Sequence, residues 1–82
     1  MSKYDPLYKW LHSQSAKNVS ATFAQIEVVL GFELPETARD KAQWWANEVG
    51  DTRHVQCQAW MDAGFETRNL NITKESVEFV KA

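Results

Sequence analysis

The sequence predicts a small α+β domain in which helices come first and a β-hairpin closes the chain. Apolar residues recur at helical spacing up to about residue 63, and alternation of apolar and polar residues takes over after Gly64. A length of 82 residues allows one modest core, so we expect residues 1–82 to form a single domain. The hydrophobic fraction of 44% is ordinary for folded proteins, which argues against disorder.

The first predicted helix begins at Asp5, a favourable N-cap, with Pro6 in its first turn. It should end between residues 14 and 17, and its apolar stripe consists of Leu7, Trp10 and Leu11. Residues 18–21 are then interpreted as a short strand.

The second predicted helix has the clearest boundaries. Thr22 followed three residues later by Gln25 has the form of a capping box, and Gly31 supplies a C-terminal stop. The face expected to be buried consists of Phe23, Ile26, Val29 and Leu30.

Two further helices are expected before the hairpin. Pro35 can open a third helix from Glu36 to about Gln43. After a turn at Val49-Gly50-Asp51, Asp51 or Thr52 can cap a fourth helix from about Arg53 to Ala63, which Gly64 terminates. Its inward residues are predicted to be Val55, Ala59, Trp60 and Ala63.

The C-terminal hairpin is predicted from two alternating segments, Phe65 to Ile72 and Ser76 to Lys81, joined by a three-residue connection. Phe65 has the opposite parity to Leu70 and Ile72, so we expect either a bulge or a later start of the first strand. A two-stranded sheet is marginal alone and must pack on the helices.

The second helix, its glycine turn and the third helix have the spacing of a helix-turn-helix, and the hairpin could act as a wing. This pattern predicts a non-catalytic module that binds nucleic acid or works in a nucleic-acid-associated complex. The net charge of −2 and the scattered basic residues weigh against that hypothesis, because phosphate contacts need a basic surface. The candidate contacts are Thr37, Arg39, Lys41 and Gln43 on or beside the third helix, and Arg68 and Lys74 on the hairpin.

Four tryptophans in so short a chain must either fill the core or form a binding face. Trp44 and Trp45 are adjacent, so they cannot both point to the centre of one face of a helix or strand. Either both are buried between the fourth helix and the hairpin, or one is core and the other contacts a ligand; the sequence does not say which. Asn47 is a candidate contact or a local turn residue.

A protein-interaction module is the alternative function. The segment from Glu33 to Asp51 holds five acidic residues and two basic ones, next to the tryptophan pair. Such an acidic, aromatic face would suit a mobile-element or phage protein that occupies a phosphate-binding groove of a host protein.

Catalysis, cofactors and metals have little support in the sequence. Cys57 and His54 lie three positions apart and could share a helix face, but no further ligand or nucleophile partner is indicated. We expect a buried thiol beside a surface histidine, and a non-enzyme without cofactor or metal. The single cysteine and the lack of any apolar run of roughly 18 residues fit a cytoplasmic protein without a membrane span.

The sequence resembles a family of short, uncharacterised bacterial and phage proteins that share a domain of unknown function. The resemblance implies a common fold and no established activity. It extends over nearly the whole chain, in the strings Tyr4-Asp5-Pro6-Leu7, Trp10-Leu11, Thr22-Phe23-Ala24-Gln25-Ile26-Glu27, Leu30-Gly31-Phe32-Glu33-Leu34-Pro35, Ala38-Arg39, Trp44-Trp45-Ala46-Asn47, Ala59-Trp60, Ala63-Gly64 and Val77-Glu78-Phe79.

Overall fold

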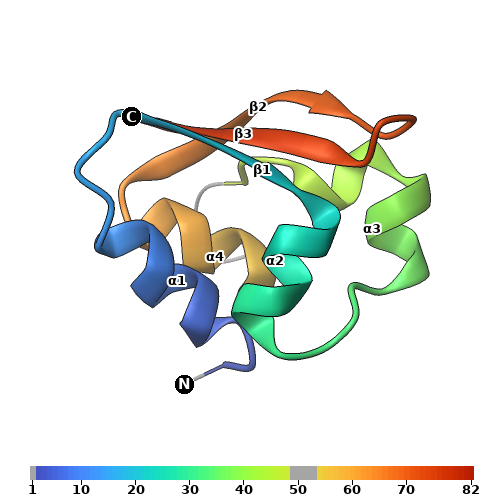
Figure 1. The fold of residues 1–82 in the computed structure, drawn as a ribbon, viewed down its shortest axis with the longest axis horizontal. Coiled ribbons are helices and arrows are strands. Elements are labelled where there is room, and N and C mark those ends of the chain that lie inside the picture. Colours follow the sequence, from blue (N-terminus) through green and yellow to red (C-terminus); the bar gives the residue numbers. More distant parts are fainter. Residues whose placement is uncertain (1, 49–53) are drawn as a thin grey trace.

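The α+β class and the C-terminal hairpin are confirmed by a computed structural model, which describes residues 2–48 and 54–82. A three-stranded antiparallel sheet lies on one side of the domain and the helices lie beneath it (Figure 1). The elements are α1 (Asp5–His12), β1 (Asn18–Thr22), α2 (Phe23–Leu30), α3 (Glu36–Asp40), the 3-10 helix η1 (Ala42–Trp45), α4 (Val55–Asp62), β2 (Phe65–Asn71) and β3 (Ser76–Lys81).

The sheet has the strand order β1-β3-β2, so the last strand of the chain lies in the middle. The short strand predicted at residues 18–21 is confirmed as β1, and it gives the hairpin the third strand that a stable sheet needs. Of the two expectations raised by Phe65, a bulge or a later strand start, the structure has the bulge. The register of β2 against β3 shifts between Arg68 and Asn71, and Asn69 has a φ of 51°.

The core fills the space between the sheet and the helices. The inner face of the sheet contributes Phe65 and Phe79, which are 1% and 0% exposed. Trp45 and Trp60 lie in the same buried cluster, together with Phe23 at the start of α2. Large aromatic side chains therefore make up much of the core volume of this small domain.

Both boundaries of α2 are as predicted, and both have local causes. The Thr22 hydroxyl accepts a hydrogen bond from the Gln25 N–H (3.1 Å), and the Gln25 side chain accepts one from the Thr22 N–H (2.8 Å). At the other end Gly31 adopts the left-handed conformation, with a φ of 83°, which ends the helix at little cost.

The third helix is shorter than the predicted span to Gln43. The helix-turn-helix-like order of α2, residues 31–35 and α3 is present, but α3 ends at Asp40. Lys41 has extended backbone angles (φ −120°, ψ 116°), and the chain restarts as the 3-10 helix η1. Trp44 and Trp45 therefore lie on a 3-10 helix, which has three residues per turn and is wound more tightly than an α-helix.

The other helices differ from the predictions in several details. α1 ends at His12, before the predicted range of residues 14 to 17. Tyr4 occupies the N-cap position of α1 without a side-chain cap, and the Asp5 carboxylate instead accepts a hydrogen bond from the Ser2 N–H (3.2 Å). Trp10 is half-buried at the margin of the core. Val55, predicted to point inward, is 48% exposed, because it is the first residue of α4 and projects past the core. The predicted turn at Val49-Gly50-Asp51 and the predicted helix cap lie outside the described residues.

Candidate functional site

The segment that follows α3 carries most of the residues predicted to be functional, and Trp45 is its buried anchor. Its indole is 2% exposed and its Nε1–H donates to the carbonyl oxygen of Ala38 (2.8 Å). The ring stacks on Phe23 (centroids 4.9 Å apart, planes at 16°) and on Trp60 (5.9 Å, 19°). Trp45 is thus a core residue, and its polar edge already has a partner.

Asn47 connects this segment to the sheet and to α4. Its Oδ1 accepts hydrogen bonds from Trp60 Nε1 (3.0 Å), Thr67 N (2.8 Å) and Thr67 Oγ1 (3.0 Å). Its Nδ2 donates to the Thr67 carbonyl (3.1 Å). Although Asn47 is exposed, its amide therefore joins distant elements of the fold, which differs from the local turn role considered from the sequence.

Arg39 is used in the same way, between two elements far apart in sequence. Its guanidinium makes ion pairs with Glu27 of α2 (2.7 Å) and with Glu75 of the β2–β3 turn. These hydrogen bonds raise the pKa of Arg39. The pKa of Glu27 is lowered, first by the Leu34 N–H that donates to its Oε2 (2.7 Å) and then by Arg39.

The four other predicted residues of this region lie together around one depression, which we call the Trp44 depression. It has a volume of about 640 Å³ and lies between the α3–η1 segment and the start of α4. Its lining consists of Thr37, Asp40, Lys41, Ala42, Gln43, Trp44, His54 and Gln56. Of these, Trp44, with its half-buried indole, is the large aromatic surface open to a ligand.

Trp44 is held rigidly where it lines the depression. Its ring meets Tyr4 edge to face (5.9 Å) and Trp45 likewise (4.7 Å). The backbone is fixed as well, because the Gln56 side chain donates to the Trp44 carbonyl (3.3 Å). A rigid aromatic surface loses little entropy on binding, as is typical of contact residues in interfaces.

The charges around the Trp44 depression are mixed, with an acidic excess close by. Asp40 and Lys41 are exposed side by side in the lining. His54 lies 3.5 Å from the Glu48 carboxylate, and Glu36 is exposed one turn before Asp40. A ligand of this depression would therefore meet an indole, amide groups and charges of both signs.

The two hairpin candidates do not line the depression. Arg68 is on β2, where its guanidinium is 3.2 Å from the Glu66 carboxylate and its backbone lies opposite Glu78 of β3. Lys74 is in the β2–β3 turn, and its N–H donates to the Asn71 side chain (2.9 Å). Two of the four predicted cations, Arg39 and Arg68, are thus paired with carboxylates.

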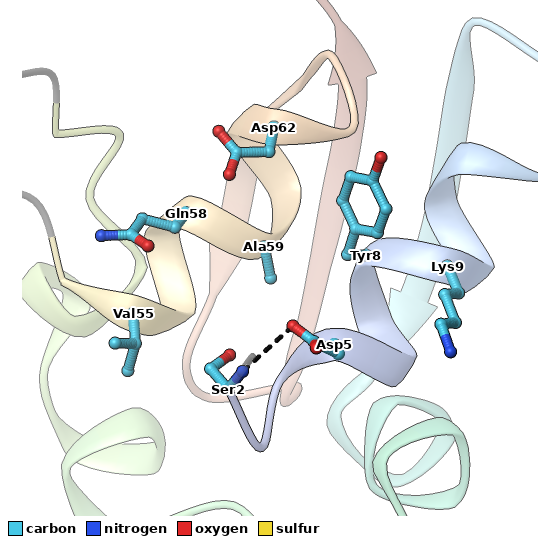
Figure 2. Close-up of a pocket in the computed structure, with 8 residues that line it drawn as sticks. All are labelled: Ser2, Asp5, Tyr8, Lys9, Val55, Gln58, Ala59 and Asp62. Atoms are coloured by element: carbon cyan, nitrogen blue, oxygen red, sulfur yellow. Dashed lines mark hydrogen bonds between the residues drawn. The ribbon is translucent and has the colours of Figure 1, made fainter.

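A second depression, between α1 and α4, was missed by sequence reasoning. It has a volume of about 510 Å³ and is lined by Ser2, Asp5, Tyr8, Lys9, Val55, Gln58, Ala59 and Asp62. Figure 2 shows the Tyr8 ring on the α1 side and Ala59 on the α4 side, with the Lys9 side chain directed away from both. The helical spacing placed Val55 on the inward face of its helix and therefore gave no signal for this depression, where Val55 is 48% exposed.

The His, Cys, Asp and Glu side chains of the described residues form no metal-binding cluster, since no three of them gather in a manner that could hold a metal ion. Cys57 is buried, accepts a hydrogen bond from the Glu48 N–H (3.1 Å) and has its Sγ 3.2 Å from Met61 Sδ, while His54 is exposed. The predicted pairing of a buried thiol with a surface histidine is confirmed. Within residues 2–48 and 54–82, the helices are too short or too polar to cross a membrane.

Comparison with known proteins gives a family and no activity. No curated protein and no solved structure shows significant similarity to the chain. The model of the domain of unknown function DUF7662 matches residues 4–82, from Tyr4 in the core to the C-terminal residue. The chain belongs to this DUF7662 family.

Proposed function

We propose that this domain is a non-catalytic protein-interaction module, and that the Trp44 depression receives a short segment of a partner protein. The observation that carries the proposal is the half-buried, rigidly packed indole of Trp44 at a concave surface of about 640 Å³. Tryptophan is enriched among residues that dominate protein interfaces. The expected segment places a large apolar side chain against Trp44 and a basic side chain near Asp40.

The charges favour a protein over a nucleic acid. Arg39 and Arg68, two of the four cations that a phosphate backbone would need, are engaged with Glu27, Glu75 and Glu66. Releasing them would cost internal ion pairs, and affinity for nucleic acid depends on basic groups that are available. Nucleic-acid binding through α3 and the hairpin stays a prediction, as does the narrower hypothesis of a host enzyme blocked by a mobile-element protein.

The proposal is tested by selecting binders from a random peptide library displayed on phage. Enriched peptides should carry an aromatic or large aliphatic residue next to Lys or Arg. Trp44→Ala should weaken their binding about 30-fold or more, because a central aromatic contact contributes roughly 2 kcal/mol. Binding is measured by titration calorimetry, and NMR shift changes should concentrate at the residues that line the depression.

The matched control is Trp10→Ala, which removes an equally large, half-buried indole from α1. It should leave peptide affinity unchanged, and thermal unfolding checks that both variants are folded. Mobility-shift titrations with random duplex and single-stranded oligonucleotides run in parallel at two salt concentrations. Salt-sensitive oligonucleotide binding that Lys41→Gln weakens, without any enriched peptide, would overturn the proposal in favour of nucleic-acid binding.

A further inference from the structure

The two edge strands of the sheet, β1 and β2, differ in how far their outward backbone groups are protected from pairing with another strand. Along β2, the Asn47 amide pairs with the outward backbone groups of Thr67, accepting from its N–H (2.8 Å) and donating to its carbonyl (3.1 Å). The bulge between Arg68 and Asn71 then bends this edge, and Glu66 and Arg68 add charge. These are devices by which proteins prevent edge-to-edge pairing.

The β1 edge has only one of these devices, at its end, where the Gln25 side chain accepts from the outward Thr22 N–H (2.8 Å). The Lys81 N–H donates to the Lys17 carbonyl (2.7 Å), and the Phe23 N–H donates to the Glu75 carbonyl (2.8 Å). Backbone groups of an antiparallel pair alternate in direction, so Asn18 and Ser20 must point theirs away from β3. No strand of the described chain lies on that side, and β1 holds neither a charged residue nor a bulge.

The alternation of polar and apolar residues along β1 is the same in both directions. Antiparallel pairing of two copies about Ser20 sets Ser20 against Ser20, Asn18 against Thr22, and Val19 against Ala21. The first two pairs are polar and exposed, whereas Val19 and Ala21 face the core side, with Val19 only half-buried. Every cross-strand pair thus joins side chains of the same polarity, and among such registers this one overlaps all five residues of β1.

We propose that β1 pairs antiparallel with β1 of a second copy of this chain, about a twofold axis at Ser20, to form one continuous six-stranded sheet. The outward N–H of each Ser20 donates to the carbonyl oxygen of Ser20 in the other copy, which gives two backbone hydrogen bonds across the axis. The dimer does not depend on what occupies the Trp44 depression.

The interface is small, so the dimer is expected to be concentration-dependent. Stable interfaces bury roughly 1,200–2,000 Å², and a pair of five-residue strands buries less. In sedimentation velocity, the mass should rise from that of one chain at micromolar concentration towards two chains at millimolar concentration. The Ser20 amide should become protected from hydrogen exchange over the same range.

Introducing a charge of either sign at Ser20 tests both the register and the twofold symmetry of the proposed dimer. Ser20→Lys puts two ammonium groups opposite each other, and Ser20→Glu does the same with two carboxylates, so each should weaken the dimer about tenfold. An equimolar mixture of the two variants should associate at least as tightly as the wild type. Thr73→Lys is the control, because it adds the same charge at an exposed position of the β2–β3 turn and should leave the dimer unchanged.

Two results would overturn the proposal. A wild-type chain that stays monomeric at millimolar concentration excludes the dimer, and so does a Lys/Glu mixture that associates no better than either variant alone. If the Ser20 amide becomes protected only when another protein is added, the edge belongs to that partner and the second copy is excluded.

Discussion

Trp44 and Trp45 are neighbours in sequence and have opposite roles in the structure. Trp45 is 2% exposed, hydrogen-bonded through its indole N–H and stacked between Phe23 and Trp60. Trp44 packs on Tyr4 with part of its ring and leaves the rest open to the depression. The 3-10 turn separates their directions by about 120°, so one short segment both fills the core and presents a surface.

The difference shows that membership of a distinctive sequence motif does not make a residue available to contact a ligand or partner. Arg39, Trp45 and Asn47 have the side-chain types of a binding site, yet each has its polar groups engaged within the fold. The side chains that remain open nearby include Thr37, Gln43 and Trp44. Substitutions on the two sides of the segment should therefore separate stability from binding.

The largest effect is expected from Trp45→Ala. Removing a buried tryptophan leaves a cavity and strands the Ala38 carbonyl, which should lower the free energy of unfolding by about 4 kcal/mol. For a domain of this size that loss is comparable to the whole stability. Chemical denaturation followed by circular dichroism measures it.

Trp45→Phe is the companion variant, since it keeps an aromatic ring and loses only the hydrogen bond and part of the volume. It should fold with an intermediate loss. A Trp45→Ala protein as stable as Trp44→Ala would contradict the contrast between the two tryptophans.

The next effect is expected from Asn47→Ala. The substitution leaves the N–H groups of Trp60 and Thr67 without their common acceptor, whereas the Thr67 hydroxyl keeps the Trp45 carbonyl, and the loss should cost about 2 kcal/mol. Asn47→Asp keeps the acceptor oxygen but loses the donor to the Thr67 carbonyl, so it should cost less. Equal losses for the two variants would show that the acceptor role is unimportant.

The smallest effect is expected from Glu27→Gln, and it depends on pH. The folded-state pKa of Glu27 lies below its unfolded value of about 4.3, so its stabilisation is present above that pH and is lost as the pH falls through the folded-state pKa. The variant should lose less stability at neutral pH than Asn47→Ala and should show a flatter decline in acid. Glu33→Gln, at an exposed position, is the control and should keep the wild-type pH profile.

The local elements were largely predictable because their causes are local. The capping box at Thr22, the glycine stop at Gly31 and the alternation of the hairpin all depend on residues close in sequence. The parity of Phe65 indicated an irregularity, either a bulge or a later strand start, and the structure has the bulge. The early end of α3 was not predictable, since Ala38 must be placed to accept from the Trp45 indole and Arg39 to reach Glu75 across the fold.

The sequence by itself determined the class, the order of the elements and the fact that two adjacent tryptophans cannot share one direction. Only the tertiary structure decided which of them is core. That choice depends on Phe23, Trp60 and Ala38, which come from three other elements, and on a 3-10 turn that local propensity does not specify. The burial of a side chain depends on contacts with segments that are distant in sequence. The local sequence around Trp44 and Trp45 therefore does not determine which of the two is buried.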